Sequence, residues 1–295
     1  VLLSNPDLLH ATLLPSHHAE WKPFLTNLKL VVIDEAHAYH GVFGSHVALV
    51  LRRLRRICAR YGARPRFVCC SATIANPREH MARLTGLPAS SLSVITADAA
   101  PAGWRTLALW NPPRVEPSAL IEWHEKLAPG AARRRASSMH EAAHLLATML
   151  QHGLRTIAFV RTRAVAERLF EAARDRLPSA LRPRLACYRA GYTLEERRDV
   201  ERRLFGGELH GVVATTALEL GVDVGGLDAT IHLGYPGTTA SLAQQAGRAG
   251  RSGRDAVAIL VAADNPMEQS LVAAPRLVLD RPLEQTVIDP TNPHI

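Results

Sequence analysis

Apolar residues along the chain fall into short runs that alternate with stretches of helical periodicity. Residues 28–34 (LKLVVID) and 66–72 (RFVCCSA) have the length and composition of buried strands. Between them, apolar positions in 44–61 recur every three to four residues, which predicts a helix with one buried face. Strands that alternate with helices indicate an α/β fold, a parallel sheet with helices on both of its faces.

The second part of the chain repeats this alternation. The expected strands are 154–160, 184–190, 211–216, 229–234 and 256–262, and the expected helices are 163–177, 193–205 and 239–247. A further helix over 139–152 would open with a capping box formed by Ser138 and Glu141. Stretches rich in Pro and Gly at 97–104, 111–117 and 128–138 predict the passage between two domains. Beyond residue 264 we expect a short helix and then extended chain.

Composition narrows the class of partner. The net charge of +8 favours an anionic partner such as nucleic acid. Only three of the 35 basic residues are lysines, however, and such an arginine bias can also come from the base composition of a genome. No apolar run reaches the roughly 20 residues that a membrane span needs. Four cysteines without a C-x-x-C pair favour free thiols in a reducing cytoplasm.

The segment VVIDEAH (31–37) ends an apolar strand with two carboxylates and a histidine. Ligands of parallel α/β sheets bind at the carboxyl ends of strands. Asp34 is therefore a candidate ligand for the Mg²⁺ that bridges ATP phosphates, and Glu35 a candidate to orient or deprotonate the attacking water. His37 would link this site to the neighbouring strand end. The alternative is a capped strand end with solvated acids.

Small hydroxyl residues end the next strand, in Ser71-Ala72-Thr73. The two hydroxyls can bond His37 and the backbone, so Ser71 and Thr73 are candidates to couple the nucleotide site to other surfaces. On its own the tripeptide carries no information. It gains meaning because it ends the strand that follows DEAH.

The segment 215–228 (TTALELGVDVGGLD) follows another apolar strand. Thr215 and Thr216 are candidates to contact a phosphodiester backbone. Gly221 and Asp223 are nucleotide-binding candidates, Asp223 through a ribose hydroxyl. A plain turn from strand to helix, with Gly at a cap, explains the same residues structurally.

The segment 244–254 (QQAGRAGRSGR) places Arg248 and Arg251 three residues apart, which predicts that they share one helical face. A guanidinium is planar and always charged, so it suits the charge that develops on a γ-phosphate. The alternative is a basic, solvated turn.

These four segments, in this order, resemble motifs II, III, V and VI of superfamily-two DEAD/DEAH-box helicases. Motif VI has the form Q-x-x-G-R-x-G-R, which begins at Gln244 and implies a coupling role for it. Residues 4–10 look like motif Ib and residues 159–163 like motif IV. The resemblance therefore implies that Asn5, Asp7, Arg161 and Thr162 contact nucleic acid.

A narrower resemblance, to the YprA/MrfA-type helicases related to the Hrq group, is carried by 33–58, 235–254 and 281–295. It implies a 3′-to-5′ DNA helicase or translocase of DNA repair, driven by ATP and Mg²⁺, with DNA favoured over RNA as the partner. It also implies a cytoplasmic, nucleoid-associated protein without a membrane part. An RNA helicase and a non-hydrolysing nucleic-acid clamp are the alternatives.

The Walker A loop, G-x-x-x-x-G-K-[ST], occurs nowhere in the chain. The resemblance therefore implies a fragment that begins at motif Ib and is inactive alone. The expected fold is two RecA-like lobes, the first incomplete because its Walker A strand is absent. The expected division is lobe 1 over 1–105, a linker over 106–137, lobe 2 over 138–265 and a C-terminal extension over 266–295.

Overall fold

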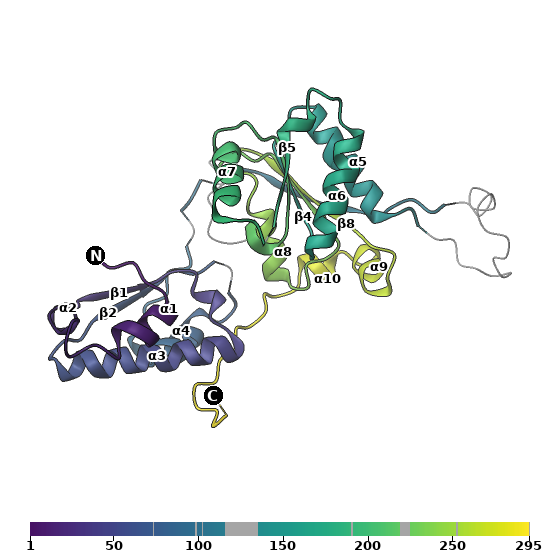
Figure 1. Ribbon diagram of the computed structural model, residues 1–295. Helices are drawn as coiled ribbons and strands as arrows, with labels where there is room; N and C mark the ends of the chain where they lie inside the picture. The colour runs from purple at the N-terminus through teal and green to yellow at the C-terminus, as the bar shows by residue number, and fades with distance from the viewer. Residues whose placement is uncertain are drawn as a thin grey trace. The chain divides into compact units, whose positions relative to one another are not determined.

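The chain folds into two compact units, which are seen in Figure 1. The computed structural model describes residues 1–72, 74–97, 99–101, 103–115, 135–189, 191–218, 225–251 and 253–294. Unit 1 comprises Val1–Asp98 together with Leu283–Ile295, and unit 2 comprises Ala99–Pro282. The end of the chain therefore belongs to the same unit as its beginning.

Unit 1 contains a sheet of two parallel strands, β1 (Leu30–Ile33) and β2 (Arg66–Cys69), in which Ile33 is paired with Cys69. The helix α3 (Gly41–Arg60) connects them and turns its buried residues, among them Val47, Leu51 and Leu54, into a core shared with Ile33. The remaining elements are α1 (Pro6–Leu8), the π-helix η1 (Leu9–Leu13), α2 (Lys22–Thr26), the 3₁₀ turn η2 (Ala36–Ala38), α4 (Pro77–Thr85) and η3 (Ala89–Ser91).

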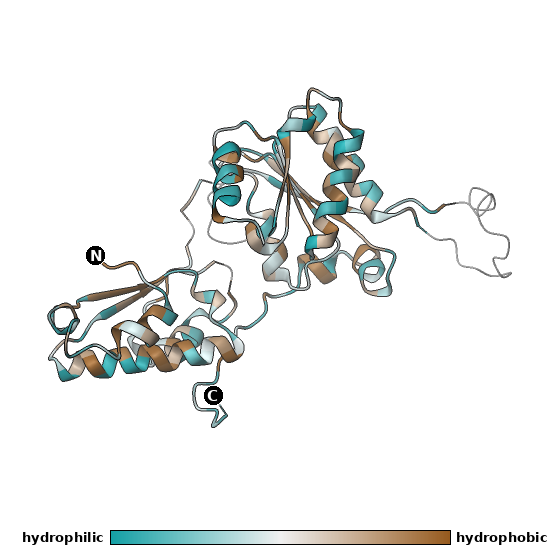
Figure 2. Cartoon of the chain, viewed as in Figure 1, coloured by the Kyte–Doolittle hydropathy of each residue, from teal (hydrophilic) through white to brown (hydrophobic). Residues whose placement is uncertain are grey.

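The other face of this small sheet is apolar and exposed. Side chains alternate along a strand, so Ile33 points into the core while Leu30 and Val32 do not. Leu30 is 50% exposed, Val32 58% and Val68 46%. Figure 2 shows both strands as largely hydrophobic. The sequence predicted the two strands correctly, but their burial is one-sided.

Unit 2 contains a sheet of six parallel strands in the order β3-β8-β7-β4-β6-β5. Its strands are β3 (Arg105–Trp110), β4 (Thr156–Phe159), β5 (Leu185–Tyr188), β6 (Gly211–Ala214), β7 (Ala229–Leu233) and β8 (Ala256–Val261). Its helices are α5 (Ser138–Gln151), α6 (Arg163–Arg176), α7 (Leu194–Phe205), α8 (Thr239–Ala246), α9 (Pro266–Ala273) and α10 (Arg276–Leu279), with 3₁₀ turns η5 (Arg182–Arg184) and η6 (Thr216–Leu218).

Both faces of this larger sheet are covered. Along β4, Ala158 packs into the core formed with α5 and α6, whereas Ile157 and Phe159 pack into the core formed with α7. All four residues of β4 are buried, as are all four of β6. Burial on both sides explains why these strands are continuous apolar runs in the sequence.

Two expectations about the middle of the chain are wrong. The segment expected as a linker, 106–137, begins with β3, a strand that pairs with β8 along its whole length. The capping box expected at Ser138 is absent: the N-cap residue is Ser137, without a side-chain cap, and Glu141 accepts a hydrogen bond from Trp110 Nε1 at 3.0 Å. The capping box that does form, between Thr193 and Glu196, opens α7.

The cysteines differ in burial, and burial affects the pKa of their thiols. Cys58 and Cys187 are buried and free, while Cys70 is free and exposed. Burial raises the pKa of Cys69 and of Cys187 to about 11, so both thiols stay protonated near neutral pH. Within the described ranges, no helix is both long and apolar enough to cross a membrane.

Candidate nucleotide and nucleic-acid site

The turn that follows β1 carries the acidic pair of the DEAH segment. Asp34 is exposed, and its Oδ1 accepts a hydrogen bond from the backbone N–H of Glu35 at 2.9 Å. Glu35 has φ 47° and ψ 43°, in the left-handed region, and among the described residues it is the only one other than glycine with a positive φ. Such a conformation costs of order 1 kcal/mol or more and persists only where surrounding contacts enforce it.

Three hydrogen bonds enforce it from the residues on either side. The N–H of Ala36 donates to the carbonyl of Cys70 at 2.9 Å, and the N–H of Cys70 donates to the carbonyl of Ile33 at 2.8 Å. On the opposite side of the turn, Nε2–H of His80 donates to the carbonyl of Ala36 at 3.1 Å. His80 is fully buried, and burial lowers its pKa, so the ring is neutral. The turn is therefore fixed both by β2 and by α4.

His37 lies against the end of β2. Its Nδ1 accepts from the N–H of Ala72 at 3.3 Å and lies 3.4 Å from Ser71 Oγ. The carboxylate of Glu35 is 3.6 Å from the same nitrogen, longer than a hydrogen bond. The structure thus brings His37 and Ser71 together; Thr73 lies outside the described residues.

Asp34 is the residue of unit 1 that fits a magnesium ion. Its side chain is exposed, and its Oδ1 accepts the hydrogen bond from the N–H of Glu35. Mg²⁺ in nucleotide sites is commonly held by one or two carboxylates, with phosphates and waters completing its shell. A complete protein cage of three or more His, Cys, Asp or Glu residues is absent from the described part of the chain. The donor set therefore suits Mg²⁺ that arrives with phosphates.

The arginines that follow α8 do not share a helical face, which corrects the expectation from their spacing. Helix α8 ends at Ala246, and Gly250 has φ +76°. A Cβ on Gly250 would lie 2.9 Å from Ala256 Cβ, and its N–H donates to the carbonyl of Leu227 at 3.1 Å. A glycine suits this close approach and this positive φ. The chain between Arg248 and Arg251 is therefore not helical. As a result Arg248 is buried, at 6% exposure, and Arg251 is half-buried.

A buried network beside these arginines was missed by the sequence analysis. Gln245 is 3% exposed, and its Oε1 accepts from Nδ1–H of His232 at 3.0 Å; Nε2 of the same ring accepts from the hydroxyl of Thr230 at 3.0 Å. The ring stacks on Phe159, and burial lowers the pKa of His232 to about 4. The network ties α8 to β7. Gln244, the residue expected to act in coupling, is half-buried.

The residues expected to contact nucleic acid fall into two groups. Asn5 and Thr162 are N-cap residues, whose side chains accept from Leu8 N–H at 2.8 Å and from Val165 N–H at 3.3 Å. The others differ in exposure: Asp7, Arg161 and Thr216 are exposed, while Thr215 is buried at 8%. Arg161 also donates to the carbonyl of Tyr235. Gly221 and Asp223 lie outside the described residues.

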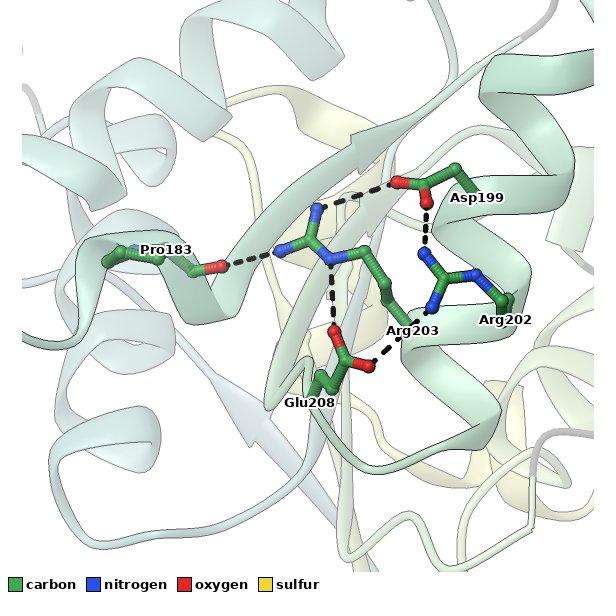
Figure 3. A network of polar contacts seen from close by, with 5 residues as sticks. All are labelled: Pro183, Asp199, Arg202, Arg203 and Glu208. Carbon is green, nitrogen blue, oxygen red and sulfur yellow. Dashed lines mark hydrogen bonds and ion pairs between the residues drawn. The ribbon is translucent and has the colours of Figure 1, made fainter.

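Part of the positive charge is used inside unit 2. Figure 3 shows Arg202 and Arg203 of α7 between the carboxylates of Asp199 and Glu208. Arg203 also donates to the carbonyl of Pro183 at 2.9 Å. The ion pairs lie at the end of α7, and the bond from Arg203 to Pro183 connects this helix end to the segment before β5. The number of arginines in the sequence therefore overstates how many are available to an anionic partner.

Comparison with known proteins agrees with this arrangement. Residues 1–81 match the DEAD/DEAH box helicase family, and residues 139–253 match the helicase conserved C-terminal domain. The chain belongs to the DEAD/DEAH box helicases. The helicase chain is 40% identical over 297 residues to the ATP-dependent helicase hrq1 of Schizosaccharomyces pombe, covering 99% of this chain and 27% of that protein. It is 41% identical over 293 residues to the ATP-dependent helicase YprA of Bacillus subtilis, covering 99% and 37%.

Its fold is that of a solved relative. The crystal structure of the DUF1998 helicase MrfA bound to DNA and AMPPNP matches with a TM-score of 0.89 and 41% identity, over 98% of this helicase chain and 38% of that one. The expected α/β class, with RecA-like parallel sheets, is confirmed. The chain spans between about a quarter and two fifths of the length of the relatives it matches.

Proposed function

We propose that this chain supplies most of the motor of an ATP-dependent helicase that moves 3′ to 5′ along DNA and acts in repair. The observation that carries the proposal is the DEAH turn, where Glu35 is held in the left-handed region between β2 and α4. The similarity to a helicase whose structure holds both DNA and AMPPNP supports ATP and DNA as ligands. We place the protein in the cytoplasm, associated with the nucleoid.

The proposed chemistry starts at Asp34, which would hold Mg²⁺. When bound there, Mg²⁺ would supply positive charge to the transferred phosphoryl group. Glu35 orients the attacking water and accepts its proton, because it follows Asp34 directly and its backbone is fixed. Arg248 and Arg251 supply positive charge to the γ-phosphate, which in related enzymes is worth about 10³–10⁵ in rate.

Coupling and strand contacts use the remaining residues. His37 and Ser71, 3.4 Å apart, would connect the nucleotide to the end of β2, together with Thr73 and, in the second unit, Gln244. Gly221 and Asp223 would bind the nucleotide, Asp223 through a ribose hydroxyl. Phosphodiester contacts would come from the motif Ib, IV and V residues: Asn5, Asp7, Arg161, Thr162, Thr215 and Thr216. Backbone contacts of this kind carry little sequence preference.

The test is steady-state ATP hydrolysis by the full-length protein in the presence of single-stranded DNA. Glu35→Gln keeps the size of the side chain and removes the base, so we expect kcat to fall by about 10²–10⁴. Glu20→Gln is the matched control, since Glu20 is an exposed acid of the same unit. Hydrolysis near the wild-type rate in Glu35→Gln would contradict the role of Glu35. If single-stranded RNA stimulates ATP hydrolysis and single-stranded DNA does not, the result would favour an RNA helicase.

A further inference from the structure

The last part of the chain lies directly against the elements that carry the DEAH turn. Residues 286–289, here termed the returning segment, follow α10 of unit 2 in sequence but belong to unit 1. In Figure 1 the yellow end of the chain runs beside α3. The backbone of residues 286–289 takes part in five hydrogen bonds to α3, to α4 and to its N-cap residue. In one of them the guanidinium of Arg83 in α4 donates to the carbonyl of Ile288 at 3.2 Å.

On one side the returning segment holds the first turn of α3. The N–H of Gly41 donates to the carbonyl of Val287 at 2.8 Å. The N–H of Asp289 donates to Ser45 Oγ at 2.9 Å, while the Ser45 hydroxyl donates to the carbonyl of Gly41 at 2.8 Å. Gly41 lies four residues after His37, so these bonds fix the chain where it leaves the DEAH turn.

Between these bonds, Ile288 enters the core of unit 1 and is 1% exposed. The fit there is close. A Cβ on Gly44 would lie 2.7 Å from Ile288 Cγ2 and 2.3 Å from the carbonyl oxygen of Tyr39. Glycine at position 44 therefore lets the isoleucine pack against the loop from DEAH into α3.

On the other side the returning segment holds the start of α4. The side chain of Asn76 exchanges two hydrogen bonds with the backbone of Thr286, accepting from its N–H at 2.9 Å and donating to its carbonyl at 3.1 Å. Asn76 is the N-cap residue of α4, yet its side chain makes no cap bond, because it is used here. One turn further on, His80 donates to the carbonyl of Ala36 next to Glu35.

We propose that the returning segment positions the DEAH turn: it fixes α3 through Gly41 and α4 through Asn76, and α4 fixes Ala36 through His80. Ile288, Asn76 and His80 act as positioning residues through their contacts within unit 1. Glu35 keeps its left-handed backbone because both sides of the turn are held. The expected effect on ATP hydrolysis rests on the proposed function. The expected effect on the backbone of the DEAH turn does not.

The experiment compares four variants in the full-length protein. Ile288→Ala removes the core contact, and Asn76→Ala removes both bonds to Thr286. Ile288→Val keeps the branched Cβ that faces Gly44 and should restore the wild-type behaviour. Thr291→Ala is the control, because Thr291 is exposed, lies outside the returning segment, and among the described residues its hydrogen bonds go to Asp289 and not to α3 or α4. Amide exchange in 35–44 and the kcat and KM for ATP are measured on each.

We expect amide exchange in 35–44 to be at least about tenfold faster in Ile288→Ala and Asn76→Ala, as local opening becomes easier. We expect kcat to fall about tenfold while KM for ATP changes less than about twofold, since the effect acts on orientation at the reacting centre. Ile288→Val and Thr291→Ala should stay within about twofold of wild type.

A lower thermal midpoint with unchanged exchange in 35–44 and unchanged kcat per folded molecule would overturn the proposal, because the segment would then only add stability. If the Ile288→Ala protein does not fold, amide exchange in 35–44 and kcat of Asn76→Ala alone test the proposal. A wild-type protein that does not hydrolyse ATP would contradict the proposed function. In that case the exchange measurement still tests whether the segment holds the turn.

Discussion

The two units differ in how their sheets are buried. In unit 2, six parallel strands are covered by buried apolar residues on both faces, and β4 and β6 are buried along their whole length. In unit 1, two strands pack on one core, and Leu30 and Val32 remain at least half exposed on the other face. Apolar surface removed from water contributes about 25 cal/mol per Å², so the same kind of strand stabilises unit 2 more than unit 1.

The less buried unit carries the most constrained turn. Glu35 adopts the left-handed conformation in unit 1, and the contacts that hold it come from β2, α4 and the returning segment. Local precision here comes from hydrogen bonds to a few neighbours and one buried isoleucine. A large core is therefore not what fixes the candidate catalytic geometry.

The largest expected difference is between the isolated units. A fragment of residues 99–282 retains the buried apolar residues on both faces of its sheet and should unfold cooperatively, with a stability of the order of 5 kcal/mol or more. A fragment of residues 1–98 loses Ile288 and the bonds to Asn76, and should show no cooperative transition. Thermal and urea unfolding of both fragments would measure this. A cooperative, stable 1–98 fragment would break the comparison.

The next expected effect is confined to unit 2 and depends on pH. Burial lowers the pKa of His232 to about 4, so the ring is neutral in the folded protein. An unfolded chain would protonate it below about pH 6.5, so it binds more protons than the folded chain between about pH 6.5 and 4. Stability present above pH 6.5 should therefore be lost as the pH falls toward 4, by up to about 3 kcal/mol.

This pH dependence is checked by urea unfolding of the 99–282 fragment at several pH values. His232→Gln should flatten the profile between pH about 6.5 and 4, whereas His144→Gln, at an exposed position of α5, should leave its slope unchanged. An unchanged slope in His232→Gln would show that this ring is not the buried neutral group.

The smallest expected effect comes from a matched pair of strand valines. Val213 of β6 is fully buried, whereas Val32 of β1 is 58% exposed. Val213→Ala should lower the free energy of unfolding by about 2 kcal/mol, because it leaves a cavity. Val32→Ala should change it by about 0.5 kcal/mol or less, as is usual at exposed positions. Equal losses in chemical unfolding would mean that Val32 is covered after all.

The sequence predicted those strands and helices whose buried residues follow a regular apolar pattern. The strand around Val213 is a continuous apolar run because both faces of the sheet are covered there, Val213 packing into one core and Val212 and Ala214 into the other. The contact of His37 with Ser71 was also predictable, since adjacent parallel strands end at the same edge of a sheet. The strand β3 was missed because Pro- and Gly-rich stretches flank it.

The remaining errors come from contacts between residues far apart in the chain. Asn76 and Thr286 are 210 residues apart, and no local pattern announces their pairing. The Ser138–Glu141 pattern was a valid local signal, but Trp110 takes the carboxylate. The spacing of Arg248 and Arg251 implied one helical face, but α8 ends at Ala246, before both arginines, and Gly250 has a positive φ. In each case a tertiary contact prevailed over a local preference.

The central claim is that ATP hydrolysis at the DEAH turn drives movement on DNA, and strand displacement tests it most directly. The full-length protein would be mixed with a DNA duplex that carries a single-stranded 3′ tail, with ATP or with AMPPNP. We expect the wild-type protein to separate the strands with ATP only, and Glu35→Gln to bind the DNA without separating it. Displacement that persists with AMPPNP or in Glu35→Gln would contradict the claim.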